Sequence, residues 1–391
     1  MRWGAPLPED VGRPAIVRAL LERAVAAAPE NAALHAKLGY LDYDRHDYRA
    51  AALSFATALR LGSAEDNLRT LLGRCYNYLG RPADALDALH GGQAANFERG
   101  RALMELGDAA GAEREFRAIL AGRPDDPGAC RMLCRILRLG GRIAELVALC
   151  ETLAGRGATN AQLLYNWGWA LALAGERDRA RRLLFDPERI ERIRLSVPPG
   201  FAGMAEFNRA LAEELLGHPD QLSDFAVEDE ANRGSRRIDD LFTGRRPDLI
   251  RLLLDSIQEA VSAWIPAPAE GFDPWPRARP DSARLRPWGL IQRGDDYEEG
   301  HIHPGGWLSG VYYVKVPPAI ADASPPGPGC IEFGPPARLA ESVPDAPAAR
   351  YVPSEGLLLL APSHYRHRTI PSGIDDDRIS IAFDVVPDPA A

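Results

Sequence analysis

The segment that decides the fold of the C-terminal half reads Gly300-His-Ile-His-Pro-Gly-Gly-Trp-Leu-Ser-Gly-Val-Tyr-Tyr-Val-Lys-Val-Pro317. Its second part, residues 307–316, is rich in aliphatic, β-branched and aromatic residues and is bounded by Gly and Pro, which predicts a β-strand. Just before it, His301 and His303 are two positions apart, so an extended backbone would point both imidazoles to the same face. The segment therefore predicts a strand that follows two candidate ligands for one metal ion.

Further strand-like segments surround this one. They share apolar, β-branched character and Pro or Gly boundaries, and they cover residues 288–293, 329–333, 356–361 and 378–386. Short strands at this spacing favour a sandwich or jelly roll. A third histidine, His367, follows the strand at 356–361, and Arg378 opens the last strand.

These residues resemble a bacterial and phage family of 2-oxoglutarate- and iron(II)-dependent oxygenases. The resemblance covers roughly residues 200–391 and is strongest over residues 286–386, where it rests on the segments 300–317, 355–363 and 378–383 together with His367 and Pro371. It implies a double-stranded β-helix (jelly roll), iron(II) and 2-oxoglutarate as cofactors, and oxidation coupled to decarboxylation of 2-oxoglutarate to succinate.

The resemblance also implies a role for each candidate site residue. Iron(II) in such enzymes is bound by a facial triad of two His and one carboxylate. Here His301, His303 and His367 would be the metal ligands, and the Arg378 fork would bind the distal carboxylate of 2-oxoglutarate. The remaining cofactor-binding candidates are Ser380, Tyr313 and Gln292, of which Tyr313 and Gln292 could equally be ordinary sheet packing.

One position departs from the family pattern, because His303 stands where the usual H-x-D/E motif has a carboxylate. Three interpretations compete. In the first, which we favour, all three metal ligands are histidines. In the second, one His of the pair binds the metal together with a nearby carboxylate, for which the candidates are Asp295, Asp296, Glu298 and Glu299. In the third, the protein supplies two ligands and water completes the site. A neutral third ligand would leave the complex one charge more positive, which should alter the iron affinity and redox potential.

The N-terminal half has the pattern of a helical repeat. Apolar residues recur at helical spacing over residues 15–185, and the turns His46 to Gly80, Gly107 to Gly141 and Gly141 to Gly175 are each 34 residues apart. The step from Gly80 to Gly107 is only 27 residues, which predicts a short or broken helix near 90–92. This period and the alternation of small and large residues resemble tetratricopeptide repeats, of which we expect four to five. Joining such repeats to an oxygenase domain is similar to some peptidyl aspartyl/asparaginyl and prolyl hydroxylases, whose motifs differ in detail.

Two further helices, at 204–216 and 247–264, are expected to buttress the sheet. The predicted fold class is therefore an α + β two-domain protein: a tetratricopeptide-like α-solenoid over residues 1–195, and a jelly-roll, cupin-like oxygenase domain over residues 196–391.

Composition excludes several classes of function. The net charge of −9 argues against nucleic-acid binding, which needs a basic face. No segment approaches the ~20 apolar residues of a membrane helix, and the N-terminus has no apolar signal region. An odd set of five cysteines without a CxxC pair fits a reducing cytoplasm.

We thus expect an oxygenase, most simply a hydroxylase, whose repeats present a peptide or protein substrate; a small natural product is the alternative substrate. Two rival hypotheses remain: a repeat scaffold with a degenerate, non-catalytic jelly roll, and a three-His dioxygenase that does not use 2-oxoglutarate. We further expect His364 to lie exposed, and Trp288 and Trp307 to belong to the core.

Overall fold

The structure is a computed structural model that describes residues 1–4, 14–65, 67–90, 96–221, 231–264, 272–322, 327–336, 339 and 348–388. The chain divides into two compact units. One spans Val11–Gly141, and the other combines Met1–Asp10 with Arg142–Ala391. Each unit is described by itself.

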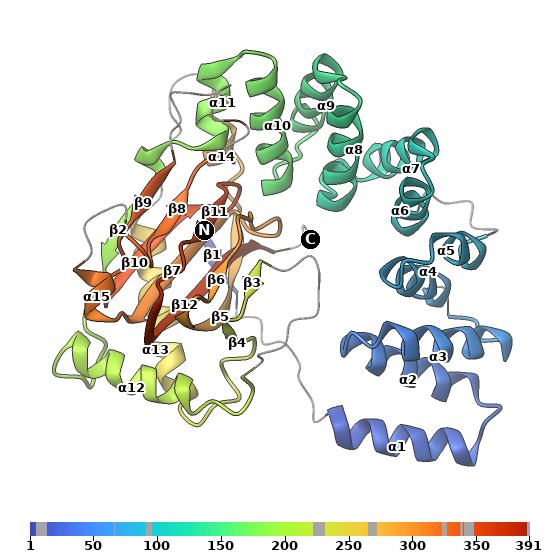
Figure 1. Cartoon of the computed structure of the whole chain (residues 1–391), viewed down its shortest axis with the longest axis horizontal. Coiled ribbons are helices and arrows are strands. Elements are labelled where there is room, and N and C mark those ends of the chain that lie inside the picture. Colours follow the sequence, from blue (N-terminus) through green and yellow to red (C-terminus); the bar gives the residue numbers. More distant parts are fainter. Residues whose placement is uncertain are drawn as a thin grey trace. The chain divides into compact units, whose positions relative to one another are not determined.

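The first unit is a run of antiparallel helices (Figure 1). Their bounds are α1 (Pro14–Ala27), α2 (Ala32–Asp44), α3 (Tyr48–Arg60), α4 (Leu68–Tyr78), α5 (Pro82–Ala88), α6 (Phe97–Glu105), α7 (Ala109–Gly122) and α8 (Pro127–Leu139). Helix α5 has only seven residues, which confirms the short helix expected from the 27-residue step. Part of the predicted break, residues 91–92, lies outside the described residues.

The turns and the helix contacts both follow the repeat. Gly80, Gly107 and Gly141 have positive φ angles of 65°, 84° and 68° after α4, α6 and α8, the left-handed conformation in which helices commonly end. His46 takes the same place after α2 with φ 60°. Within a pair, small residues allow close approach: a Cβ on Gly39 would lie 2.6 Å from the Phe55 ring.

The second unit begins with three more helices and continues with the helices around the sheet. They are α9 (Ile143–Gly155), α10 (Ala161–Leu173), α11 (Arg177–Leu184), α12 (Met204–Leu216), α13 (Pro247–Ala263), and the short α14 (Pro274–Arg277) and α15 (Pro318–Ala321). The helices predicted at 204–216 and 247–264 are thus present as α12 and α13.

The larger sheet of this unit has seven strands. Six follow the order β1 (Arg2–Trp3), β5 (Ser282–Gly294), β12 (Ile374–Pro387), β7 (Leu308–Lys315), β10 (Leu357–Pro362) and β2 (Glu191–Arg194), and β4 (Arg236–Ile238) pairs with β5 off this path. Its central strands are those predicted from sequence; β10 is buried along its whole length, and most residues of β5, β7 and β12 are buried.

Two smaller sheets complete the β-structure. One has the order β11 (His367–Thr369), β8 (Ile331–Phe333), β9 (Ala349–Tyr351), and the other pairs β3 (Asn232–Arg233) with β6 (Tyr297–Glu298). Side chains of the seven-stranded sheet and of β8 and β11 line one cavity between them. This curled pair of sheets confirms the predicted jelly roll.

Helix α12 packs on β7 on the side away from this cavity. The Tyr312 hydroxyl donates to Asn208 Oδ1 over 2.7 Å, and Tyr312 is fully buried. Because side chains alternate along a strand, Tyr312 faces the helix while its neighbours Val311 and Tyr313 line the cavity. The helix thereby fixes the strand that carries part of the site, as expected of a buttress.

The predicted domain boundary at residue 195 lies inside the second compact unit. Strand β2 pairs with β10, and the Phe185 ring contacts the Tyr365 ring at 5.8 Å between centroids. The last repeat helix is therefore joined to the sheet, and the division at residue 195 stays a prediction. No helix of the described ranges is long and apolar enough to cross a membrane.

Candidate metal centre

Two of the candidate histidines are joined by their backbones. His301 and His367 form an antiparallel bridge in which each N–H donates to the other's carbonyl oxygen over 3.0 Å. The His303 N–H donates to the Ser363 carbonyl over 3.0 Å. The H-x-H segment is thus joined by its backbone to His367 and to Ser363, although 64 residues separate His303 from His367.

The outer ring nitrogen of each histidine has a fixed partner. His301 Nδ1 lies 2.7 Å from the Glu299 carbonyl oxygen, and His367 Nδ1 lies 3.1 Å from the Tyr365 carbonyl oxygen. His303 Nδ1 lies 3.2 Å from Asp384 Oδ1. These oxygens only accept, so each ring carries its proton on Nδ1, which leaves the Nε2 lone pair free. This is the arrangement in which histidines bind metals.

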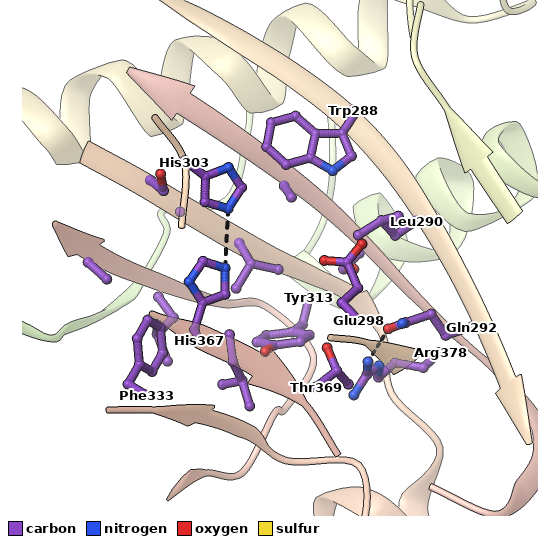
Figure 2. Close-up of a pocket in the computed structure, with 18 of the residues that line it drawn as sticks. Trp288, Leu290, Gln292, Glu298, His303, Tyr313, Phe333, His367, Thr369 and Arg378 are labelled. Carbon is purple, nitrogen blue, oxygen red and sulfur yellow. Dashed lines mark hydrogen bonds between the residues drawn. The ribbon is translucent and has the colours of Figure 1, made fainter. Parts of the chain in front are cut away.

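The three free nitrogens converge. One candidate donor atom from each of His301, His303 and His367 lies within 4.8 Å of the other two. His303 Nε2 and His367 Nε2 are 3.2 Å apart (Figure 2), and two nitrogens held about 2.1 Å from one ion at about 90–110° would be about 3.0–3.4 Å apart. Two lone pairs at this distance repel each other, and a cation between them removes that repulsion.

Burial keeps two of these rings neutral. It lowers the pKa of His301 and lowers that of His367 well below its usual value, and the neighbouring imidazoles add to both effects. Burial also acts on His303, but the charge and hydrogen bond of Asp384 outweigh it and raise the pKa of that ring. The neutral imidazole is the form that binds a metal.

Arg378, the residue predicted to bind a carboxylate, lines the same cavity. It is 6% exposed. Its guanidinium donates to the Gly329 carbonyl over 2.6 Å and to Gln292 Oε1, and no acidic side chain in the described parts of the chain forms an ion pair with it. Burial lowers its pKa. A buried cation with only neutral partners is costly, and a bound carboxylate would relieve that cost.

The other predicted cofactor residues lie around this guanidinium. Tyr313 and Ser380 line the cavity, and their hydroxyls have no hydrogen-bond partner among the described residues. Burial raises the pKa of Tyr313 to about 12, so its hydroxyl stays a donor. Gln292 bonds Arg378 through its oxygen and Ser235 through its nitrogen, so it orients the guanidinium. In Figure 2, Gln292 and Arg378 lie together, joined by a dashed line, and the Tyr313 ring lies between them and His367.

The strands place these side chains by simple alternation. Along β12, Arg378, Ser380 and Ala382 line the cavity, and along β5 the lining residues are Trp288, Leu290 and Gln292. In each row successive members are two positions apart, so all point to one face. The β12 row continues to Asp384, which the sequence reasoning missed, although the same alternation from Arg378 would have found it.

The carboxylates considered as alternative ligands are placed differently. Asp296 accepts from the Arg293 N–H, Glu299 pairs with Arg233 on the surface, and Asp295 is exposed. Glu298 points into the cavity and lies 3.8 Å from His301 Nε2 (Figure 2). Glu298 is not part of the group of side chains whose candidate ligand atoms all lie within 4.8 Å of one another.

The sequence predicts whether three aromatic side chains near the site, Trp288, Trp307 and His364, are buried or exposed. Trp307 is buried and stacks on Trp275 at 5.1 Å, as a core residue does. Trp288 is also buried, but it lines the cavity and stacks on His303 at 5.5 Å. The expectation that His364 lies exposed was wrong: it is 1% exposed, against Trp275 and Tyr365. The chain turns inward after Pro362, so this ring faces the core.

Fold and cavity together define a jelly-roll domain in which a candidate metal centre and a buried arginine lie at one cavity. Residues 286–384 match the family model described as "Putative 2OG-Fe(II) oxygenase". The chain therefore carries a domain of this family in its C-terminal part, after the helical repeats. No curated protein sequence matches the chain significantly.

Three solved structures illustrate the similarity. A prolyl-4-hydroxylase from Pseudomonas putida is 14% identical over 51% of this chain and 93% of its own, with a TM-score of 0.34. HygX from Streptomyces hygroscopicus, with nickel, 2-oxoglutarate and hygromycin B bound, is 17% identical over 52% and 88%, with a TM-score of 0.34. YrrB, a tetratricopeptide-repeat protein with an unusual peptide-binding site, is 19% identical over 42% and 88%, with a TM-score of 0.33. These values are too low to transfer a substrate or a residue's role.

Proposed function

We propose that this protein is a non-haem iron(II)- and 2-oxoglutarate-dependent dioxygenase that uses an all-His metal site. The observation that carries the proposal is a group of three ring nitrogens, one each from His301, His303 and His367, that lie within 4.8 Å of one another. Two of these rings, His303 and His367, line a cavity that also holds the buried Arg378 guanidinium, which has no acidic partner among the described residues. Iron(II) fits the first group, because imidazole is a good ligand for it. A dicarboxylate that bridges both groups fits the cavity chemistry.

The protein's own residues would bind and orient the cofactors. His301, His303 and His367 would hold iron(II) on one side and leave its other positions open. Arg378 would bind the distal carboxylate of 2-oxoglutarate, with hydrogen bonds from Ser380 and Tyr313 and with Gln292 keeping the fork in place. Bound together, iron(II) and 2-oxoglutarate supply oxygen activation coupled to the release of succinate and carbon dioxide, and the buried walls exclude water.

Turnover of 2-oxoglutarate tests this function. Purified protein with iron(II), dioxygen and 2-oxoglutarate is expected to form succinate, and without dioxygen it is expected to show the charge-transfer band of 2-oxoglutarate chelated to iron(II). Arg378→Gln should weaken 2-oxoglutarate binding about 10- to 100-fold, as expected for lost hydrogen bonds to a charged group, and should leave metal affinity unchanged. Arg293→Gln, which removes an exposed ion pair with Asp375, is the matched control.

The outcomes separate the rival functions. Metal binding without a 2-oxoglutarate band would favour a three-His dioxygenase that does not use this cofactor, a candidate that the all-imidazole donor set supports. If the wild-type protein binds no divalent metal, the remaining hypothesis is a non-catalytic repeat scaffold with a degenerate jelly roll.

We further propose that the substrate is a peptide or protein presented by the repeats. Large apolar side chains of the first unit stay exposed, namely Leu53 at 72%, Leu106 at 51% and Leu139 at 68%, and solenoid surfaces of this kind bind peptide segments. Incubation with a peptide library, followed by mass spectrometry for the addition of one oxygen, tests this. Modification of a small molecule but of no peptide would contradict it.

A further inference from the structure

An acidic side chain stands behind one of the three imidazoles. Asp384 Oδ1 lies 3.2 Å from His303 Nδ1, on the side of the ring opposite to the Nε2 that faces His367. Asp384 is 7% exposed. Of the three candidate ligands, His303 is the one whose Nδ1 meets a charged oxygen; those of His301 and His367 meet backbone carbonyls.

The carboxylate is built into the sheet by further hydrogen bonds. The Ser309 hydroxyl donates to Asp384 Oδ1 over 2.6 Å, and it lies 2.7 Å from the Ser363 hydroxyl. Ser309 is the register partner of Asp384 across β7 and β12. Ser363 also accepts the His303 N–H through its carbonyl, so backbone and ring of His303 are held by the same group of residues.

Close packing keeps this group in place. A Cβ on Gly306 would collide with the Ser363 hydroxyl and lie 3.3 Å from Asp384 Cβ, so only glycine allows the H-x-H loop to lie over the carboxylate. On the other face of the ring, Trp288 stacks on His303. The His303 ring is thereby fixed in both position and tautomer.

The three imidazoles supply no negative charge to a bound metal ion, and Asp384 stands where it could supply one. A triad with one carboxylate ligand places one negative charge on the ion, whereas three neutral imidazoles place none. A carboxylate hydrogen-bonded to Nδ1 draws that proton toward itself and makes the ring a stronger, partly anionic ligand. The negative charge that a carboxylate ligand would place on the metal would then come from Asp384, one hydrogen bond further away, through the His303 ring.

We propose that Asp384 is a positioning residue that holds the proton on His303 Nδ1, aims Nε2 at the ion, and supplies through this ring the negative charge that an H-x-D site places on the metal directly. This inference rests on the proposed metal site but not on the use of 2-oxoglutarate. Asp384 contacts neither ion nor substrate, and it acts only through His303.

Metal affinity and redox potential test the proposal without enzyme turnover. Asp384→Asn keeps the size of the side chain and removes its charge. It should weaken Co(II) and Mn(II) binding about 10- to 100-fold, the usual cost of losing such a partner, and should shift the Fe(III)/Fe(II) potential upward, because less negative charge stabilises Fe(III) less. The Co(II) absorption spectrum should change with it.

Ser309→Ala is the matched control. It removes a hydrogen bond from the same carboxylate oxygen but leaves the charge and the contact with His303, so the potential should stay close to that of the wild type. If both variants lose affinity equally and the potential does not move in Asp384→Asn, the carboxylate is structural and the proposal is overturned. If Asp384→Asn binds metal as the wild type does, it is overturned as well.

A measurement on the wild-type protein covers the case in which Asp384→Asn does not fold. In Zn(II)-loaded protein, nuclear magnetic resonance should show a far-downfield exchangeable proton on His303 Nδ1, shifted away from those of His301 and His367. A proton on Nε2 of His303, or Zn(II) bound to its Nδ1, would refute the assignment. Failure of 2-oxoglutarate turnover in a protein that binds metal would end the proposed oxygenase function but leave this inference standing, whereas a wild type that binds no metal would end both.

Discussion

His364 shows how far a buried side chain can depart from its chemistry in water. Both of its ring nitrogens are buried without a hydrogen-bond partner in the described parts of the chain. Burial lowers its pKa to about 3. The ring is therefore neutral when the protein is folded, and it is protonated below about pH 6.5 only when the protein unfolds.

This shift predicts a pH dependence of stability. Between pH 6.5 and 3 the unfolded state binds one more proton at His364, so stability should fall as pH falls through this range. The contribution reaches about 2 kcal/mol at pH 5. His364→Leu removes this contribution. Urea unfolding should therefore show that the free energy of unfolding falls less between pH 7 and pH 5 in the variant than in the wild type, by about the same 2 kcal/mol. An equal pH dependence in both proteins would show that the ring is not buried in its neutral form.

The candidate site residues stand out in the sequence for a plain reason. An H-x-H pair, a later histidine and an arginine at the start of an apolar strand each carry a recognisable chemistry. Asp384 has no such signature, because an acid near the end of a strand is common. Alternation along the strand places it on the same face as Arg378, but its contact with His303 appears only in the folded structure.

Among the elements, the loop between β6 and β7 positions two of the three imidazoles. Two adjacent glycines in it have different surroundings: a Cβ on Gly306 would collide with Ser363, whereas a Cβ on Gly305 would meet nothing within 4 Å. We expect Gly306→Ala to displace the loop, lower metal affinity at least tenfold and destabilise the fold by about 1–3 kcal/mol. Gly305→Ala should leave both close to wild type, and equal effects of the two would contradict the loop geometry.

The three-stranded sheet that carries His367 is held across its strands by Glu332. This side chain, 12% exposed, pairs with Arg350 on β9 at 2.7 Å and with Arg368 on β11 at 2.6 Å. Burial alone would raise its pKa, but the hydrogen bonds and charges of the two arginines outweigh it and lower the pKa. The ion pairs therefore stabilise the fold above the unfolded-state pKa, about 4.3, and this contribution is lost as pH falls below it.

Glu332→Gln should accordingly destabilise the protein by about 1 kcal/mol at pH 7. The difference from the wild type should shrink below about pH 4, where the wild-type carboxylate also becomes neutral. Glu299→Gln, which removes the half-exposed pair with Arg233, is the control and should cost less. Thermal unfolding of the three proteins at both pH values measures this, and a constant difference would argue against the ion pairs.

Element prediction succeeded where the periodicity was long and failed for the shortest pieces. The five predicted strands correspond to β5, β7, β8, β10 and β12, with ends that differ by a few residues. Strands such as β1, β3 and β6 have two residues each, too few to show alternation. These short strands form because the edge of a neighbouring strand offers backbone hydrogen bonds, and that edge is brought close only by the tertiary structure.

For the whole molecule, the compact unit that holds the site combines Met1–Asp10 with the chain from Arg142 onward, so the predicted boundary at residue 195 lies inside it. Tyr365, buried two residues before His367, donates its hydroxyl to the Arg182 carbonyl over 3.0 Å and packs on Phe185. Strand β2, Glu191–Arg194, forms the edge beside β10. The sequence could not reveal this, because α10 and α11 continue the repeat pattern without a break.

Truncation distinguishes the two boundaries. A chain that begins at Arg142 should unfold cooperatively and bind metal, whereas one that begins at residue 196 should lose several kcal/mol of stability, since removing a buried Phe alone costs about 3–5 kcal/mol. Calorimetry and Co(II) titration of both chains test this. Full stability of the shorter chain would support the boundary at residue 195.

Anomalous diffraction from a crystal grown with Mn(II) and 2-oxoglutarate would show whether three imidazoles hold one ion beside a carboxylate-binding arginine. We expect a single Mn(II) bound by Nε2 of His301, His303 and His367, with the distal carboxylate of 2-oxoglutarate on Arg378. An ion held by Glu298 with His303 turned away, or no ion between these rings, would contradict it.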